Sequence, residues 1–203
     1  MQVDPVFRGE YPAELTEAFG EMWPDFPAED WPLIQTPFDF LGINYYSRNV
    51  VRDAPGEHPL RAARVRQTQS VHTEMDWEVF PEALTRVLVW IKERYGNLPM
   101  YITENGAAFD DPAHVTDGVV DDPLRLWYYR EHLRAAHDAI AKGVDLRGYF
   151  AWSLLDNFEW AYGYSKRFGL MHVDFDTLAR RPKASARFYA DVIRTHGAAL
   201  AGA

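Results

Sequence analysis

The sequence contains no cysteine, and this absence excludes disulfide bonds, thiolate nucleophiles and cysteine-ligated zinc sites. It also has no run that approaches the roughly 18 apolar residues of a membrane-spanning helix. Residues 1–5 carry neither the basic region nor the apolar region of a secretory signal peptide. We therefore expect a cytoplasmic protein that does not use a membrane as a partner.

Positive charge is scarce, because 21 Lys and Arg residues stand against 30 Asp and Glu residues and the net charge is −9. A chain this acidic repels nucleic acid, which we exclude as a partner. The Walker A, Gly-x-Gly-x-x-Gly, His-Glu-x-x-His and Gly-x-Ser-x-Gly motifs are also missing. His132 and His137 lie five positions apart in a predicted helix. That spacing suits one metal ion poorly, so we interpret both as packing or surface residues.

Apolar residues are plentiful, since 47% of the 203 residues are hydrophobic. This is enough for a domain with a sizeable core, and no Gly/Ser-rich linker divides the chain. We therefore expect one domain over residues 1–203. Aromatic residues make up 15% of the chain. Their rings can fill a core or stack against the apolar face of a sugar, and composition alone does not separate these uses.

Strand and helix patterns alternate along the chain. We expect buried strands at residues 38–46, 100–103 and 146–155, and helices at 81–96, 123–142 and 183–195, with a short helix at 13–22. Apolar residues at helical spacing predict the buried face of the helix at 81–96 to be Leu84, Leu88, Ile91 and Tyr95, and that of the helix at 123–142 to be Leu126, Tyr129, Leu133, Ala136 and Ile140. Irregular loops are expected at 52–75, 107–120 and 156–182. Apolar strands that alternate with helices predict parallel βαβ units, and therefore an α/β fold.

Polar and aromatic residues follow each predicted strand, which is where functional residues gather in parallel α/β folds. Glu104 comes directly after the second strand. A carboxylate there can be a general base, a metal ligand, a glycosidase nucleophile or a structural group that caps a turn. The residues alone leave these alternatives open.

The other two strands end in similar clusters. Asn44 and Tyr46 are two positions apart on the first strand and project to one face, where the phenol can hydrogen-bond a carboxylate or simply pack. Trp152, Glu159 and Trp160 follow the third strand. A carboxylate among indoles suits a sugar with vicinal hydroxyls, and it is equally compatible with a core Trp pair beside a surface Glu.

Taken together, these clusters resemble the C-terminal portion of glycoside hydrolase family 1, the β-glucosidases and their relatives. The resemblance runs from about residue 4 to 194. It is carried by the stretches Asp4–Phe7 with Tyr11–Pro12, Phe38–Ser47, Met75–Pro81, Tyr101–Gly106 and Ala151–Leu170. It implies a TIM (β/α)8 barrel, of which this chain supplies about strands six to eight with their helices.

The resemblance also implies a role for each residue. Glu104 matches the family's catalytic nucleophile, and Tyr46 matches the tyrosine that hydrogen-bonds and orients it. The residues that match sugar-binding positions are Asn44 in the pocket, Trp152 on its floor, Glu159 on the 4- and 6-hydroxyls, Trp160 on the 3-hydroxyl side, Phe168 in an aromatic wall and Trp77 on the aglycone side. The retaining mechanism needs two carboxyl groups, and no metal or organic cofactor.

The chain departs from the family pattern because it has no Asn-Glu-Pro, the motif that carries the acid/base glutamate. Three strands cannot close a barrel, so we expect a complementary N-terminal barrel chain, self-association or the rest of the same polypeptide as a partner. The leading hypothesis is an enzyme part that acts on a β-glucoside or oligosaccharide. The alternatives are a non-catalytic module that binds a sugar or a partner, and a cut piece of a normal enzyme.

Overall fold

The structure, a computed structural model, describes residues 3–111 and 115–201. The chain forms two compact units, Met1–Asp39 with Asn49–Gln67, and Phe40–Arg48 with Thr68–Ala203. The single domain expected over the whole chain stays a prediction. In the described ranges, no helix combines the length and the apolar character that crossing a membrane requires.

The first unit consists of short elements around aromatic side chains. Its helices are α1 (Asp4–Arg8), α2 (Ala13–Phe19) and α3 (Trp31–Ile34), with 3-10 turns η1 (Gly20–Met22) and η2 (Ala28–Asp30). The ring of Tyr11 stacks on Phe26 with centroids 4.8 Å apart and meets Trp23 edge-on at 5.1 Å. Strands β2 (Val51–Asp53) and β3 (Ala62–Arg64) form an antiparallel hairpin inside the segment that was expected to be irregular.

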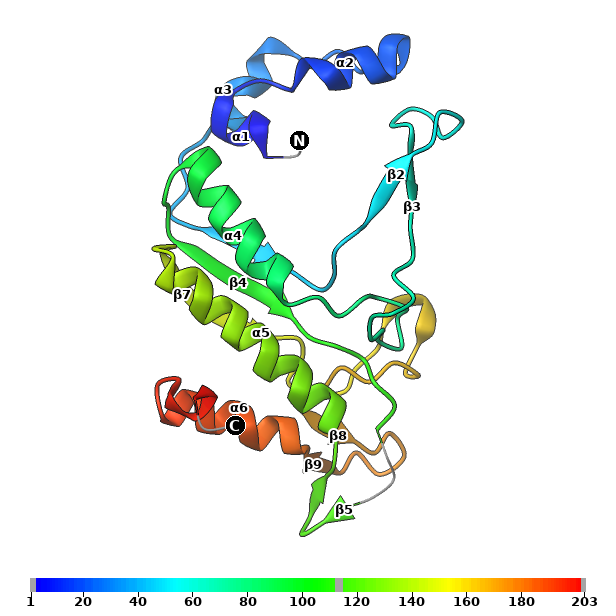
Figure 1. Cartoon of the computed structure of the whole chain (residues 1–203), viewed down its shortest axis with the longest axis vertical. Helices are drawn as coiled ribbons and strands as arrows, with labels where there is room; N and C mark the ends of the chain where they lie inside the picture. Colours follow the sequence, from blue (N-terminus) through cyan, green and yellow to red (C-terminus); the bar gives the residue numbers. More distant parts are fainter. Residues whose placement is uncertain (1–2, 112–114, 202–203) are drawn as a thin grey trace. The chain divides into compact units, whose positions relative to one another are not determined.

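The second unit is built on a three-stranded parallel sheet in the order β1 (Leu41–Asn44), β4 (Met100–Asn105) and β7 (Leu146–Ala151). Helices α4 (Glu82–Tyr95), α5 (Pro123–Ala141) and α6 (Ala184–Arg194) follow β1, β4 and β7 in turn, and α5 packs against both of the others (Figure 1). The predicted order of strand, loop and helix is therefore present three times.

Each loop also contains structure that the sequence did not predict. The strands β5 (Val115–Thr116) and β6 (Val119–Val120) form one hairpin, and β8 (Met171–Val173) and β9 (Arg180–Pro182) form another. Two further 3-10 turns are η3 (Trp160–Tyr162) and η4 (Ala198–Leu200). These strands have two or three residues each, too few for a periodic hydrophobic pattern to appear.

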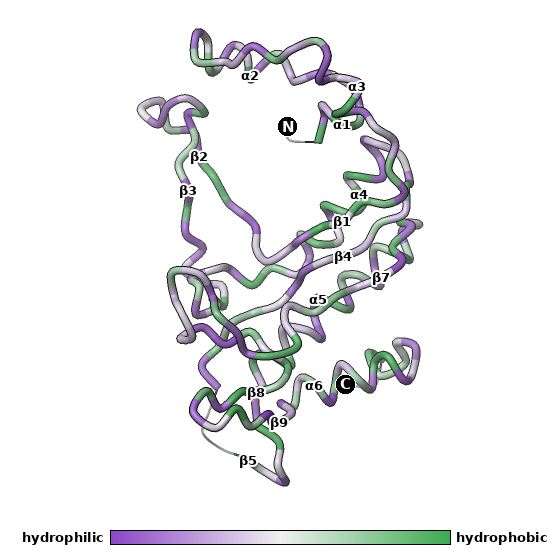
Figure 2. The backbone as a smooth tube through the Cα atoms, turned by 180° about the vertical axis from the view of Figure 1, so that it is seen from behind, coloured by the Kyte–Doolittle hydropathy of each residue, from purple (hydrophilic) through white to green (hydrophobic). Residues whose placement is uncertain are grey.

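One face of the parallel sheet carries the core. Leu84, Leu88 and Ile91 of α4 are buried as their spacing predicted, and they pack in one cluster with Met100 and Ile102 of β4. The middle of α4 is hydrophobic and its last turn, Lys92–Tyr95, is hydrophilic, as the tube in Figure 2 shows. The burial of this helix face fixes α4 against the sheet.

The other face of the sheet is open and holds glycines. Gly42, Tyr101 and Gly148 lie in one row across β1, β4 and β7. A Cβ atom on Gly148 would lie 2.5 Å from Cδ1 of Tyr101, so a larger residue there would collide with the ring. Phe150, on the same strand, is 57% exposed. This face therefore presents apolar surface that the described residues leave uncovered.

Helix α5 differs from its predicted face. Tyr129, Leu133 and Ala136 are buried as expected, but Ile140 is 49% exposed. The helix instead buries polar side chains, Arg125 and His132 among them. A purely apolar pattern misses Arg125 because its guanidinium is paired with Asp111 and Asp122, which offsets the cost of its burial. It misses His132 because that ring is held by a hydrogen bond to the Tyr128 carbonyl of the same helix.

His132 gives folding a pH dependence. It is fully buried and stacks on Tyr128 at 3.9 Å. Burial lowers the pKa of His132 from 6.5 to about 4, although its hydrogen bond to the Tyr128 carbonyl opposes this. As pH falls from 6.5 to 4, His132 becomes protonated in the unfolded chain but stays neutral in the folded chain. Stability is therefore lost over this window, by roughly 3 kcal/mol in total.

We expect the His132→Phe variant to lose this contribution, because the phenyl ring retains the stacking without a titrating group. The measurement is the melting temperature between pH 4 and 7, for the parent and the variant side by side. The parent should fall more steeply toward acid pH. His137→Phe, a change at the exposed histidine of the same helix, is the control and should keep the parent's slope. Parallel curves for parent and His132→Phe would contradict the assignment.

Candidate active site

Glu104 lies near the end of β4, where the parallel pairing changes register. Asn44 of β1 pairs with Glu104 after an irregularity, and the Tyr45 amide donates to the Glu104 carbonyl at 2.9 Å. This places the hydroxyl of Tyr46 2.7 Å from Oε2 of Glu104, to which it donates. Burial, and then the Glu104 carboxylate, raise the pKa of Tyr46 well above its usual value. The phenol therefore stays protonated as a donor to the carboxylate.

Asn105 secures the backbone beside Glu104. It is fully buried, and its side-chain amide donates to the Tyr45 carbonyl at 2.7 Å and to the Tyr128 hydroxyl at 3.0 Å. Its carbonyl oxygen accepts a short hydrogen bond from Tyr149 of β7. Sequence reasoning did not single out Asn105, although a buried polar residue next to Glu104 in an apolar strand was a signal. Its bonds to three elements hold the end of β4 in place.

Asn44 is exposed at the end of β1, and its Oδ1 accepts from the hydroxyl of Thr103 at 2.7 Å. The structure thus pairs Asn44 with the neighbour of Glu104 on β4. Its amide group remains on the same open side of the sheet end, where a hydroxylated ligand can reach it.

Aromatic rings form a wall beside the Tyr46–Glu104 pair. The ring of Trp77 lies 5.1 Å from Tyr46 and 6.2 Å from Phe168, and Phe168 meets Tyr46 edge-on at 6.3 Å. Phe168 is 2% exposed, whereas Trp77 and Tyr46 are partly buried. Three of the predicted site residues therefore converge from three separate loops.

An ion pair that sequence reasoning missed anchors the segment that carries Trp77. Arg48 donates from Nε and Nη2 to the two carboxylate oxygens of Glu78, at 2.8 and 2.9 Å, and Ser70 donates to the same carboxylate at 2.7 Å. Hydrogen bonds from Arg48 lower the pKa of Glu78, which is 4% exposed. The guanidinium also lies over the ring of Phe80 at 3.3 Å. Because Glu78 directly follows Trp77, this ion pair holds the segment of Trp77 against the residues that follow β1.

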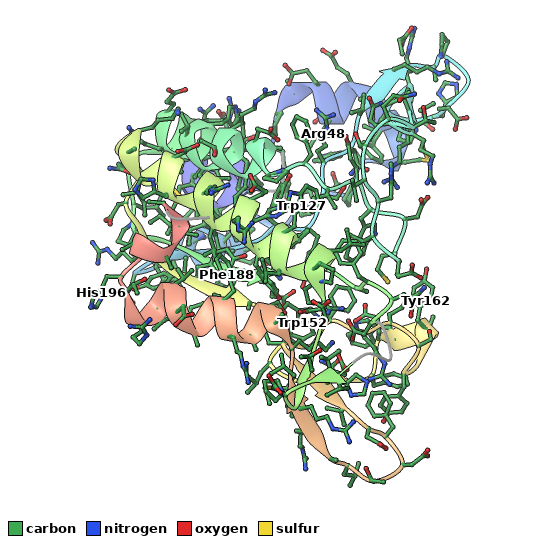
Figure 3. The ribbon with its side chains drawn as sticks, turned by 60° about the horizontal axis from the view of Figure 1, so that its bottom comes forward. Arg48, Trp127, Trp152, Tyr162, Phe188 and His196 are labelled. Atoms are coloured by element: carbon green, nitrogen blue, oxygen red, sulfur yellow. The ribbon has the colours of Figure 1, made fainter. Side chains whose placement is uncertain are left out.

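The loop after β7 carries the remaining predicted residues. The Trp152 amide donates to the Asn105 carbonyl at 2.8 Å, and its own carbonyl accepts from Tyr129 of α5 at 3.2 Å. Trp152 therefore lies at the end of the sheet where α5 begins, as labelled in Figure 3. Burial and the nearby charge of Glu104 raise the pKa of Glu159.

Trp160 is 81% exposed. It begins η3, on a stretch whose Tyr162, labelled in Figure 3, is also exposed. The structure therefore brings Glu104, Tyr46, Trp77 and Phe168 into one cluster and places Glu159 within electrostatic reach. Trp160 remains on open surface.

An ion pair connects two of the loops around the cluster of Glu104, Tyr46, Trp77 and Phe168. Lys166 lies 3.3 Å from the carboxylate of Glu74, and the Glu74 amide donates to the Ala108 carbonyl at 2.9 Å. The segments that bear Trp77, Glu104 and Phe168 are thereby connected directly. A carboxylate with a fixed donor, a second carboxylate and an aromatic wall can position a sugar and attack it.

Comparison with known proteins identifies similar chains. The family model described as Glycosyl hydrolase family 1 matches residues 1–198. β-Glucosidase A of Thermotoga maritima is 44% identical over 195 residues, covering 96% of this chain and 43% of that protein. A β-glucosidase of Agrobacterium sp. is 46% identical over 188 residues, covering 92% and 40%. A bifunctional β-D-glucosidase/β-D-fucosidase of Bifidobacterium breve is 44% identical over 216 residues, covering 97% and 46%.

Solved structures agree with these relatives. A family 1 β-glucosidase from Thermotoga maritima superimposes with a TM-score of 0.89 at 44% identity, over 96% of this chain and 43% of that one. The same enzyme in complex with deoxynojirimycin gives 0.89 at 43% identity. The chain therefore spans less than half the length of the relatives it matches. These likenesses confirm the predicted fold class, the C-terminal part of a TIM barrel with a parallel sheet.

Proposed function

Because the chain belongs to glycosyl hydrolase family 1, we propose that it is the nucleophile-bearing part of a retaining β-glucosidase. The substrate is a terminal β-D-glucosyl residue, or a related β-glycosyl residue, of a glucoside or oligosaccharide. The observation that carries the proposal is the hydrogen bond from Tyr46 to Glu104 at 2.7 Å, at the C-terminal end of a parallel strand. Catalytic residues of TIM barrels lie at this end of the strands.

Glu104 is the nucleophile in this mechanism. Its free carboxylate oxygen attacks the anomeric carbon while Tyr46 holds the other, and a covalent glycosyl-enzyme forms. The aglycone leaves from the opposite face of the ring. Water then hydrolyses the intermediate with the assistance of a second carboxyl group, which in retaining enzymes lies about 5–5.5 Å from the first.

The other site residues hold the sugar. Glu159 accepts hydrogen bonds from two hydroxyls, Trp152 forms the floor, and Asn44 and Trp160 contact further hydroxyls. Phe168 and Trp77 supply the aromatic wall, with Trp77 toward the aglycone. Support comes from the contacts among Trp77, Tyr46 and Phe168 and from the raised pKa of Glu159 near Glu104.

Activity requires the rest of a barrel. β1 and β7 are the edges of the three-stranded sheet among the described residues, and an eight-stranded barrel leaves no such edges. We therefore propose that an N-terminal barrel segment, on this polypeptide or on another chain, covers the open face and supplies the acid/base glutamate. Self-association of two copies would not supply that group.

Covalent trapping tests the proposal. The chain is joined to the N-terminal remainder of the Thermotoga maritima relative to make a completed barrel. This protein is incubated with a 2-deoxy-2-fluoro-β-D-glucoside that has a dinitrophenolate leaving group. The fluorine slows hydrolysis of the glycosyl-enzyme intermediate. The dinitrophenolate leaves without protonation, so the first step does not need the general acid. Mass spectrometry of peptides should then find one fluoroglucosyl group on Glu104. A label on another residue, or none with a folded protein, contradicts the proposal.

A second candidate is a non-catalytic module that binds sugar without hydrolysis. It is favoured by the absence of an Asn-Glu-Pro motif in the chain. Calorimetry with glucose, together with the trapping experiment, separates the two. Binding of glucose without any covalent label on the completed barrel would favour the module.

Loss of the Tyr46 hydroxyl should weaken the nucleophile's orientation. A hydrogen bond to a charged group is worth about 1.5–3 kcal/mol, so Tyr46→Phe is expected to slow trapping of the completed barrel by roughly 10- to 100-fold. The reason is that Glu104 loses the donor that holds its second oxygen. Tyr164→Phe, at an exposed tyrosine of the loop after β7, is the matched control and should trap at the parent's rate. Equal rates for all three proteins would remove Tyr46 from the mechanism.

A further inference from the structure

We propose that a cluster of six charged residues, five of them with buried side chains, positions the sugar-holding loop against the nucleophile. The cluster consists of Asp111, Asp122, Asp156, Arg125, Arg167 and Lys183, so its three carboxylates and three cations balance. This role rests on the proposed function and assigns residues outside the predicted site. Its members lie in the loops that follow β4 and β7 and at the starts of α5 and α6.

Asp156 closes the loop that carries Glu159 and Phe168. Its Oδ1 accepts from the Gly169 amide at 2.9 Å, and its Oδ2 accepts from Arg167 Nη1 at 2.7 Å and from the Val173 amide at 3.3 Å. These contacts flank Phe168, so one carboxylate holds the Arg167 side chain on one side of that residue and the Gly169 backbone on the other. Gly169 is required here, because a Cβ atom on it would lie 2.1 Å from the Asp156 amide nitrogen.

Lys183 joins this loop to the loop after β4. Its Nζ lies 2.9 Å from Oδ1 of Asp156 and 2.5 Å from Oδ2 of Asp111, and its side chain is fully buried. Asp111 follows Glu104 by seven residues, in the loop that leaves β4. Lys183 therefore links the segment after the nucleophile to the segment that holds the sugar.

Arg125, also fully buried, completes the connection from the first turn of α5. Its Nη1 lies 2.5 Å from Asp111 and 2.8 Å from Asp122, and its Nη2 donates to the Arg167 carbonyl at 2.8 Å. Asp122 in turn accepts from the amide of Ser185, at 2.8 Å, at the start of α6. The guanidinium thus connects the loops after β4 and β7 at the start of α5, and Asp122 extends the connection to the start of α6.

The residues that Asp156 holds are the neighbours of Phe168, which belongs to the aromatic wall. Phe168, held between two Asp156 contacts, packs against Tyr46 at 6.3 Å, and Tyr46 donates to Glu104. Burial alone would raise the pKa of Asp156, but Lys183 and Arg167 lower it below its usual value, so the carboxylate remains charged. A planar guanidinium and a paired carboxylate hold geometry more narrowly than apolar contacts do. The cluster therefore has the properties of a rigid support for the pocket.

The test uses saturation kinetics of fluoroglucosyl trapping in the completed barrel. The maximal trapping rate reports Glu104, and the half-saturating concentration reports how well the loop holds the sugar. Two variants are compared with the parent. Lys183→Met with Asp111→Asn removes the bridge between loops while keeping the cluster neutral. Arg167→Met removes a partly exposed member, whose side chain is 25% exposed. Arg194→Met, on exposed surface at the other end of α6, is the control.

We expect both variants to melt cooperatively and to raise the half-saturating concentration at least about tenfold, with a maximal rate within about threefold of the parent. The control should match the parent in both parameters. Unchanged half-saturation in the folded variants overturns the positioning role. Loss of the melting transition in both variants makes the cluster a folding element alone and also overturns it. If the parent itself is not labelled, the proposed function fails instead, which is a separate result.

Discussion

Replacing Glu104 by Gln is expected to lower the rate of glycosylation of the completed barrel by about 10⁴-fold or more. An amide cannot form the covalent bond to the anomeric carbon, and removal of a catalytic nucleophile leaves only the assistance of the remaining site. Tyr46 would still have an acceptor in the amide oxygen, so the fold around the strand end should persist. The measurement is the release of dinitrophenolate from an activated β-glucoside.

The control is the configuration of the product that forms when azide replaces the missing carboxylate of a Glu104 variant. In Glu104→Ala, azide can occupy the space of the missing carboxylate and attack from the same face. The product should therefore be the α-glucosyl azide, the inverted configuration, since the aglycone leaves from the opposite face. Glu159→Ala should give no such product, because Glu159 is assigned to the hydroxyls. A β-azide from Glu104→Ala would mean that Glu104 acts as the acid/base instead.

Substituting Gly106 by Ala is expected to disrupt the site through the backbone. A Cβ atom at this position would lie 1.8 Å from the carbonyl oxygen of Trp152. No rotamer relieves a contact with backbone, so the ends of β4 and β7 must separate. We expect a loss of about 3 kcal/mol in stability and a fall of roughly 100-fold in trapping, because Glu104 lies two residues away.

Thermal melting and trapping of the same preparation test this prediction. Gly56→Ala is the matched control, since a Cβ atom on Gly56 meets nothing within 4 Å, and it should behave as the parent does. A Gly106→Ala protein that melts and traps like the Gly56→Ala protein would show that the two strand ends tolerate separation.

The sequence was informative where its pattern was local. The 3.6-residue spacing of Leu84, Leu88 and Ile91 placed the buried face of α4 correctly, because that face packs on a sheet of apolar strands. The three polar clusters were found because parallel strands end at one edge. Those two regularities gave the βαβ order and the neighbourhood of Glu104, and the family resemblance supplied the barrel.

Other features depend on partners far apart in the chain. Arg125 is buried because Asp111 and Asp122 neutralise its charge. A periodic pattern of apolar residues cannot predict the burial of an arginine. The pairing of Arg48 with Glu78 likewise spans 30 positions. The short hairpins escaped prediction because each of their strands has only two or three residues, as in β6 (Val119–Val120) and β9 (Arg180–Pro182). Tertiary contacts decide these elements, and they are absent from any local pattern.

The glycines on the open face of the sheet should restrict which substitutions are accepted on the neighbouring strand. A side chain at 148 would strike the ring of Tyr101 at 2.5 Å, and one at 42 would come within 3.0 Å of Thr103. Each glycine is thus paired with a bulkier residue on the neighbouring strand. Among homologous sequences, positions 101 and 148 should therefore covary, as should 42 and 103. A smaller residue at 101 would permit a larger one at 148, and the two changes would be accepted together far more readily than either alone.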